Sequence, residues 1–375
     1  MSPPDGDAAS GAHRLLVGTP GFEAALCAEL PAALHPRADE TLPGLVIARE
    51  PDGPAQRDGL DPVFARQQLP AAVAIAVPSV ARAADAAYAA VEAAVDAAKG
   101  PFTIHAFAPT GADAGLGSRA TLIATELLGR LRERRRRAAR AYLAPELAAA
   151  QFAETSLLIQ VLATRRDQIW VSAARPRALT GGGWTVSPWP GGVFPVADDR
   201  RPPSRAYRKL EEALAWMGDG PKAGQVCVDL GAAPGGWTHV ALGRGARVIA
   251  VDRAPLEPPV RGHRALTKVE GNAFTYEPPP ARRPVDWLLC DVICEPGRTV
   301  ELLRRWLGTP AAPWCRRLVV TVKFKGQSDY ATVLGDVRAT LRAAACPRWR
   351  IKHLHHNKNE VTVLAAAPSG ARAAR

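Results

Sequence analysis

The sequence has no long hydrophobic run and few cysteines, and each absence excludes a class of protein. No apolar stretch reaches the roughly 18 residues that a membrane-spanning helix requires, and the N-terminus lacks the basic and then apolar plan of a secretion signal. The six cysteines are scattered, and Cys290 and Cys294 have no second pair at metal-binding spacing. We therefore expect a soluble cytoplasmic protein with reduced thiols, no bound metal and no membrane partner.

The charge balance is strongly basic. The chain has 375 residues and a formal net charge of +12, which favours a polyanionic partner such as nucleic acid. A genome that encodes much arginine and alanine would produce the same excess, so the charge alone argues only weakly for RNA. The length is sufficient for two or three domains, each with its own core.

The first part of the chain predicts an α+β domain. Residues 1–12 and the tail at 367–375 have the composition of disordered segments. Between them, residues 13–174 contain strand patterns at RLLV, TLPGLVIARE, VFARQQLPAAVAIAV (interrupted by Pro70) and PFTIHAFAP, with helical patterns at EAALCAELPAAL and 81–99. The stretch SLLIQVLATRRDQIWVSA predicts a hairpin that closes a small mixed sheet.

A dense arginine run ends a helical pattern that extends from Ser118 to Tyr142. Seven arginines fall within eleven positions, at 130, 132, 134, 135, 136, 137 and 140. They cannot all serve core packing on one helix. The run is either a solvated helix face or a phosphate-binding surface.

Residues 175–203 predict a linker, because the segment is rich in Gly and Pro. Its aromatic residues Trp184, Trp189 and Phe194 would pack the linker onto a neighbouring domain, although stacking on a nucleobase is a second interpretation.

Residues 204–366 predict a doubly wound α/β domain. Ser204 is a candidate N-cap for a helix that ends at Gly218. Seven strands are expected, at 226–230, 247–252, 265–271, 285–291, 317–323, 350–356 and 360–366, with helical patterns at 237–244, 299–308 and 328–345. Only residues 357–359 separate the last two strands, and a parallel crossover needs a dozen or more residues, so the final strand must run antiparallel.

The stretch VCVDLGAAPGGWT, from Val226 to Thr238, joins the first of these strands to a helix. A glycine-rich turn of this kind lets backbone N–H groups approach a nucleotide-type ligand. The loop is neither the dinucleotide-binding G-x-G-x-x-G motif nor a P-loop. The simplest alternative is an ordinary glycine-rich turn.

Polar residues follow the carboxyl ends of the predicted strands, where open α/β sheets bind their ligands. Asp252 comes 23 residues after Asp229, at the position of an acidic group that would hold a ribose diol. Asn272 could contact an adenine edge. Asp291 and Lys323 end the fourth and fifth strands, Glu360 starts the antiparallel strand, and Lys209 lies on the helix that enters the domain, so all four should meet at one sheet edge.

These motifs resemble those of the FtsJ-like ribose 2′-O-methyltransferases, strongly over 204–366 and faintly over 13–170. The loop is similar to their D-L-G-A-x-P-G-G-W/F-[ST] motif, and PSRAYRKLEEA, LLCDV, VTVKFKG and NKNEVTV match the contexts of their Lys-Asp-Lys-Glu tetrad. The resemblance implies a seven-stranded, mostly parallel class I (Rossmann-like) methyltransferase domain after a THUMP-like, RNA-binding α+β domain. It implies S-adenosylmethionine as cofactor and large-subunit (23S) rRNA as the partner.

The resemblance also implies roles for residues. Lys209, Asp291, Lys323 and Glu360 would be catalytic, and the cofactor would be held by Asp229, Gly231, Ala232, Pro234, Gly235, Gly236, Trp237, Asp252, Asn272 and Asp291. At Asn272 the family more often has Asp. The adjacent Lys325 is a second candidate for the catalytic lysine.

The reaction type explains these residue types. A ribose hydroxyl must lose a proton, and we expect Lys323 to be the base, with its pKa lowered by the neighbouring Lys209 in a partly desolvated pocket. The alternatives are a small-molecule O-methyltransferase and a non-catalytic RNA-binding protein on the same fold.

Overall fold

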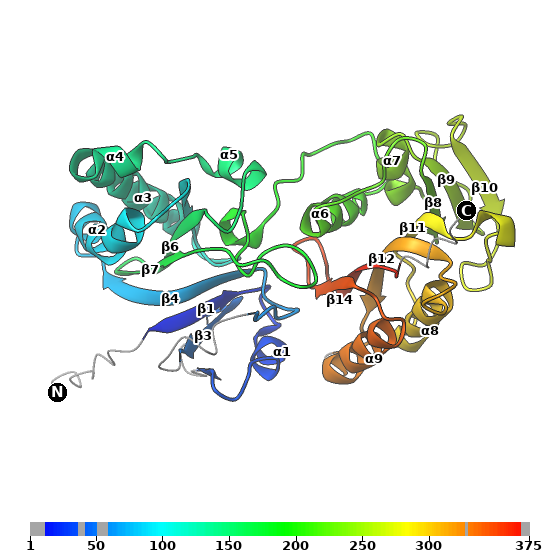
Figure 1. The fold of residues 1–375 in the computed structure, drawn as a ribbon, viewed down its shortest axis with the longest axis horizontal. Coiled ribbons are helices and arrows are strands. Elements are labelled where there is room, and N and C mark those ends of the chain that lie inside the picture. Colours follow the sequence, from blue (N-terminus) through cyan, green and yellow to red (C-terminus); the bar gives the residue numbers. More distant parts are fainter. Residues whose placement is uncertain (1–11, 37–41, 51–58, 327–328, 369–375) are drawn as a thin grey trace. The chain divides into compact units, whose positions relative to one another are not determined.

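The computed structural model describes residues 12–36, 42–50, 59–326 and 329–368 (Figure 1). The chain forms two compact units: Met1–Ala178 with Trp184–Val193, and Leu179–Gly183 with Phe194–Arg375. Nearly all of the two terminal segments predicted to be disordered lies outside the described residues. The chain passes between the units within 175–203, the segment predicted as a linker, but residues 184–193 pack as part of the first unit. None of the described helices is long and apolar enough to cross a membrane.

The first unit contains one mixed sheet of seven strands in the order β2-β3-β1-β4-β7-β6-β5. Its strands are β1 (His13–Val17), β2 (His35–Pro36), β3 (Leu45–Arg49), β4 (Gln67–Ala76), β5 (Phe102–Phe107), β6 (Leu157–Arg165) and β7 (Gln168–Ala174). Among the described strands of this sheet, only β5 and β6 pair in parallel. The predicted hairpin is confirmed as β6–β7. Pro70 does not end β4, because β4 changes partner there, from β1 on one side to β7 on the other.

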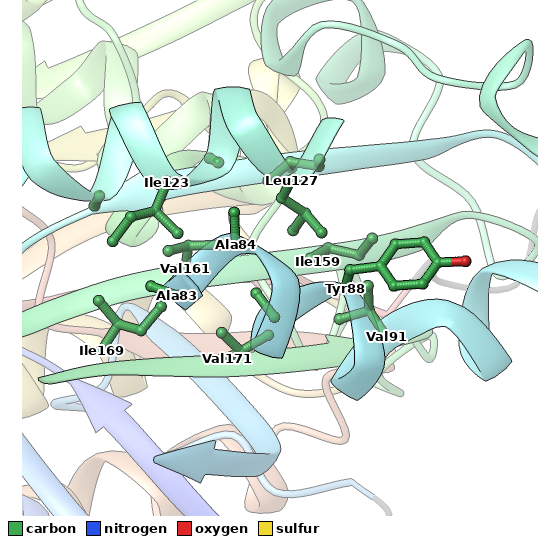
Figure 2. Close-up of a cluster of buried hydrophobic side chains, with 14 of the residues drawn as sticks. Ala83, Ala84, Tyr88, Val91, Ile123, Leu127, Ile159, Val161, Ile169 and Val171 are labelled. Atoms are coloured by element: carbon green, nitrogen blue, oxygen red, sulfur yellow. The ribbon is translucent and has the colours of Figure 1, made fainter. Parts of the chain in front are cut away.

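Two long helices cover one face of this sheet. They are α2 (Val80–Asp96) and α3 (Ala114–Arg134), and α1 (Glu23–Ala28), α4 (Arg136–Ala139) and α5 (Pro145–Ala150) are short. Figure 2 shows Ala83 and Ala84 of α2 in one buried cluster with Ile123 of α3 and Val161 of β6. Small alanines let the helix backbone approach the sheet closely, and the larger side chains fill the core around them.

Residues 184–193 lie against the first unit. The Gln67 side chain donates to Ser187 O at 3.0 Å and accepts from Ser187 N at 2.8 Å. The ring of Trp184 packs edge-on against Phe152, with centroids 5.9 Å apart. The packing role expected for Trp184 is therefore confirmed.

The second unit contains a seven-stranded sheet in the order β10-β9-β8-β11-β12-β14-β13. Its strands are β8 (Val226–Leu230), β9 (Arg247–Asp252), β10 (Leu266–Glu270), β11 (Val285–Cys290), β12 (Cys315–Lys323), β13 (Arg348–Lys352) and β14 (Glu360–Ala366). The strands from β10 to β12 in this order pair in parallel, and β14 is antiparallel to both of its neighbours. The predicted direction of the last strand is therefore confirmed, although β13 ends at Lys352 and residues 353–359 form the turn.

The helices of the second unit are α6 (Tyr207–Met217), α7 (Gly236–Gly243), α8 (Pro296–Leu307) and α9 (Tyr330–Ala343). The largest fully buried side chains here are Trp287 of β11 and Trp306 of α8. Cys227 and Cys290 are buried free thiols, as the strand patterns predicted.

Two helix predictions are wrong. Ser204 is not an N-cap: α6 begins at Tyr207, and a Cβ on Gly236 would lie only 2.4 Å from Ser204 Oγ, so Ser204 packs on the start of α7 instead. The pattern at 118–142 is not one helix, because Arg135 leaves helical geometry with φ −133° and ψ 49° and separates α3 from α4. α3 also starts earlier than expected, with the Asp113 side chain accepting from Gly115 N at its N-terminus.

Candidate active site

The glycine loop after β8 is shaped by close packing. Gly231 and Gly235 have φ of +70° and +117°, values that side chains other than glycine rarely adopt. A Cβ on Gly231 would lie 2.3 Å from Val292 Cγ2. The glycines therefore let the loop turn sharply between β8 and α7, beside the end of β11.

Several of the predicted cofactor residues hold this loop rather than face outward. Asp229 is 1% exposed, and its carboxylate accepts a hydrogen bond from Thr238 Oγ1 of α7 at 2.7 Å. Burial raises the pKa of Asp229 to about 7. Trp237 is 3% exposed and donates from Nε1 to Ala206 O at 2.9 Å. Ala232 is also buried, and Pro234 O accepts from Glu257 N at 3.0 Å.

The neighbouring strand ends carry two further predicted residues. Asp252, at the end of β9, accepts from Ala233 N at 2.9 Å and from Ala254 N at 2.8 Å. Asn272 follows β10, and its Oδ1 accepts from Phe274 N at 2.9 Å. Because β8, β9 and β10 are adjacent and parallel, Asp252 and Asn272 lie along the same sheet edge as the glycine loop.

The structure brings the predicted tetrad together as a closed ring of ion pairs. Lys209 Nζ lies 3.0 Å from Asp291 Oδ2 and 2.6 Å from Glu360 Oε1. Lys323 Nζ lies 2.7 Å from Asp291 Oδ1 and 2.6 Å from Glu360 Oε2. Each carboxylate thus serves both lysines. Lys325 stands apart, because it pairs with Glu295 and its side chain is 71% exposed.

Sheet register explains how two tetrad members meet. Lys323, the last residue of β12, is the direct cross-strand partner of Glu360, the first residue of β14. Asp291 directly follows β11, the other neighbour of β12. Lys209 reaches the group from α6. The short connection between the last two strands forces the direction of β14, and that direction puts Glu360 at this edge.

The charges of the ring set its protonation. Burial lowers the pKa of Lys323, but the attraction of Asp291 and Glu360 outweighs burial and holds the pKa above its ordinary value of 10.5. The expectation that the Lys323 pKa falls is therefore wrong for this structure. Burial likewise raises the pKa of Glu360, but the two ammonium groups more than offset this effect and hold it at about 2.

Three residues that support the tetrad were not predicted. Thr321 Oγ1 donates to Asp291 Oδ1 at 2.7 Å. Glu212 of α6 accepts from His355 N at 2.8 Å and from His356 N at 3.0 Å, and Asn357 is buried beside Glu360. Thr321 had a usable signal, since it lies two residues before Lys323 and strand side chains alternate between faces. Asn357 lies three residues before Glu360, whereas the contacts of Glu212 join distant segments and leave no local pattern.

The tetrad opens into a cavity of about 920 Å³. Lys209, Lys323 and Glu360 line it, and the rest of the lining comes mainly from the segment before α6, the start of α8 and the turn before β14. This volume is large enough for a nucleotide-sized ligand.

Comparisons with known proteins give a family match within the second unit. Residues 202–322 match the family described as FtsJ-like methyltransferase. This part of the second unit thus matches an FtsJ-like methyltransferase, as the motifs predicted.

The chain is also similar to the proteins named Ribosomal RNA large subunit methyltransferase M. That of Alkalilimnicola ehrlichii is 37% identical over 189 residues, which cover 48% of this chain and 51% of the relative. That of Laribacter hongkongensis is 34% identical over 226 residues, covering 58% and 60%. The chain thus spans about half of the length of the curated relatives it matches.

The solved structure of TrmN from Thermus thermophilus aligns over 94% of this chain and 99% of that one, with 15% identity. Its TM-score of 0.33 is too low to establish a shared fold.

Proposed function

We propose that the protein is an S-adenosylmethionine-dependent RNA ribose 2′-O-methyltransferase that acts on large-subunit rRNA. The observation that carries the proposal is the closed ring of Lys209, Asp291, Lys323 and Glu360 beside the glycine loop. Each of these residues alone would be an ordinary ion pair. Together they form one ring, three members of which line a single cavity, in a region that matches a methyltransferase family, and this arrangement favours a catalytic role. The names of the relatives support rRNA as the substrate.

The residues at the ends of β8, β9 and β10 fit S-adenosylmethionine. The loop at Gly231 and Gly235 leaves no room for a side chain on Gly231, so its backbone is the surface that a ligand would meet. Asp252 and Asn272 would face the ribose and the adenine, while buried Asp229 would position the start of α7. When bound, the cofactor supplies a methyl group already activated on a sulfonium.

The tetrad would align the target hydroxyl and remove its proton. Lys323 is the proposed base, and its proton must leave before it can accept another. Asp291 and Glu360 orient the Lys323 amine through hydrogen bonds of 2.7 and 2.6 Å. Lys209 shares both carboxylates, so it keeps them compensated when Lys323 becomes neutral. The raised pKa of Lys323 means that little of the free base exists at neutral pH.

The first unit is proposed to be a THUMP-like RNA-binding domain. Its arginine run is divided in the structure. Arg130, Arg134 and Arg135 pair with acidic residues of α2. Arg132, Arg136, Arg137 and Arg140 are exposed and have no ion pair with any described residue. The exposed four would bind phosphate, which supports the RNA-binding interpretation for part of the run.

The deciding experiment is methyl transfer from radiolabelled S-adenosylmethionine to protein-free rRNA of the host. Methylation of a ribose 2′-oxygen makes the adjacent linkage resistant to alkali, so alkaline cleavage would map the product. We expect one resistant linkage in large-subunit rRNA. No incorporation into rRNA, tRNA or assembled subunits, despite tight cofactor binding, would contradict the rRNA proposal and favour a small-molecule substrate.

Two variants test the proposed base. Lys323→Ala should abolish transfer and leave cofactor binding nearly unchanged. Lys325→Ala is the matched control and should retain activity, because Lys325 pairs with Glu295 outside the ring. Substantial activity in Lys323→Ala would identify another group as the base.

A further inference from the structure

The cavity at the tetrad is lined by many more cations than carboxylates. Its basic lining residues are Arg205, Arg208, Lys209, Arg298, Lys323, Lys325 and Lys358, and its acidic ones are Glu295 and Glu360. Such an excess needs a reason, because like charges repel one another unless an anion compensates them.

Most of these cations are already compensated within the protein. Lys209 and Lys323 share the two carboxylates of the tetrad, so the tetrad is neutral as a unit. Arg208 pairs with Asp198, and Lys325 pairs with Glu295. The charge excess at the cavity therefore comes from the remaining three, Arg205, Arg298 and Lys358.

These three residues are exposed and form no ion pair with any residue that the structure describes. They come from separate segments: Arg205 precedes α6, Arg298 lies in the first turn of α8, and Lys358 lies in the turn before β14. Three segments that are distant in sequence thus each place one uncompensated cation around the same cavity.

Contacts within the protein hold the backbone at Lys358 and the side chain of Arg298. The turn with Lys358 is fixed by His353, whose ring nitrogen bonds Lys358 O at 2.7 Å, and by Asn359 Nδ2, which donates to Phe324 O at 3.1 Å. The Arg298 guanidinium lies over the Phe274 ring, 4.0 Å from its centroid. The Arg298 guanidinium and the turn that carries Lys358 are therefore positioned before any ligand arrives, which lowers the entropy cost of binding.

We infer that Arg205, Arg298 and Lys358 form a phosphate clamp that binds the RNA backbone around the target nucleotide. The inference rests on the proposed function and deepens it. Phosphate contacts fix the register of a nucleic acid without reading its sequence. The clamp would hold the target ribose over Lys323, and it would make the enzyme select a polynucleotide over a free nucleoside. These are positioning residues, since none belongs to the tetrad.

The test measures RNA binding and methyl transfer separately in the full-length protein. Binding of a large-subunit rRNA transcript is followed across a series of KCl concentrations for wild type, Arg205→Ala, Arg298→Ala, Lys358→Ala and the triple variant. Arg298→Gln is a second variant that keeps most of the side-chain size. Arg208→Ala is the matched control, because Arg208 lines the same cavity but is paired with Asp198.

The slope of log K against log salt reports how many phosphates are neutralised. We expect each clamp substitution to lower it by about 0.7 and the triple variant by about 2, while Arg208→Ala keeps the wild-type slope. The KM for RNA should rise, with kcat at saturating RNA nearly unchanged. A triple variant with the wild-type slope would overturn the clamp. If wild type itself transfers no methyl group to RNA, the proposed function fails. The salt slopes of the variants would still show whether the three residues bind phosphate.

Discussion

At the scale of single residues, the sharing of two carboxylates by two lysines controls the chemistry. The attraction of Asp291 and Glu360 holds the pKa of Lys323 above its ordinary value. A base in that state acts only through its small neutral fraction, and this fraction grows about tenfold per pH unit below the pKa. We therefore expect the single-turnover rate of methyl transfer to rise about tenfold per pH unit from about pH 7 to about pH 9. A rate that levels off near neutral pH would show that the bound substrates lower the Lys323 pKa.

The buried carboxyl of Asp229 makes the stability of the fold fall as the pH rises. Its folded pKa of about 7 lies above its ordinary 3.8, so its contribution is fully present below about pH 4 and is lost as the pH rises through 7. A shift of this size corresponds to about 4 kcal/mol of unfolding free energy. Asp229→Asn keeps an acceptor for Thr238 and does not ionise. The difference in melting temperature between variant and wild type should therefore grow in favour of the variant between about pH 4 and pH 8; a constant difference would contradict the buried, titrating carboxyl.

At the scale of elements, the loop after β8 depends on Gly231 for two reasons. Alanine there would adopt a strained φ of +70°, and its Cβ would lie 2.3 Å from Val292 Cγ2. Gly218 separates the two effects, because it has a φ of +65° but nothing within 4 Å of an added Cβ. We expect Gly218→Ala to lower the unfolding free energy by about 1 kcal/mol, and Gly231→Ala by about 2 to 4 kcal/mol, since overpacking adds to the backbone strain. Denaturant unfolding measures both, and equal losses would rule out the contact with Val292.

The arginine run at 130–140 contains two groups of residues, one exposed and one paired with α2. The exposed arginines can be neutralised without breaking an ion pair, whereas Arg130, Arg134 and Arg135 connect α3 to Asp85, Glu92 and Asp96 of α2. Replacing Arg132, Arg136, Arg137 and Arg140 by Gln should weaken RNA binding and reduce its salt dependence, with the melting temperature unchanged. Unaltered RNA binding would show that these arginines only form a solvated helix surface.

The sequence predicted most strands and the sheet edge where the tetrad meets. It did not predict contacts between segments that are distant in sequence. The apolar runs predicted the strands, and the short final connection predicted the position of Glu360. The N-cap prediction for Ser204 was wrong because Ser204 packs against Gly236 and Ala206 accepts a hydrogen bond from Trp237, and both partners are distant in sequence. The direction of the Lys323 pKa shift depends on which of three neighbouring charges lie closest, and no pattern in the sequence encodes those distances. Arg205, Arg298 and Lys358 look like any other basic residues until their exposure is known.

At the scale of the whole molecule, the short segment 179–183 matters for the second unit. A Cβ on Gly181 would lie 2.2 Å from Trp349 O, so the segment lies directly on the edge strand β13. We expect a fragment of residues 179–375 to bind S-adenosylmethionine as the full chain does. It should bind rRNA at least about tenfold more weakly, because the proposed RNA-binding unit is gone.

A second fragment, 194–375, is the matched control. It leaves β13 uncovered and should melt at a lower temperature than 179–375. Calorimetric titration and thermal melting test both expectations. Full rRNA affinity in fragment 179–375 would assign RNA binding to the second unit alone.

The register of β12 and β14 has a consequence for how activity is lost. Lys323 and Glu360 face each other across strands that lie inside the sheet, with β13 beyond β14. Fraying of an edge cannot separate them; only a cooperative opening of the sheet can. Amide hydrogens of β14 should therefore exchange as slowly as those of the core of the second unit, and heat should destroy the tetrad and the second unit in a single step.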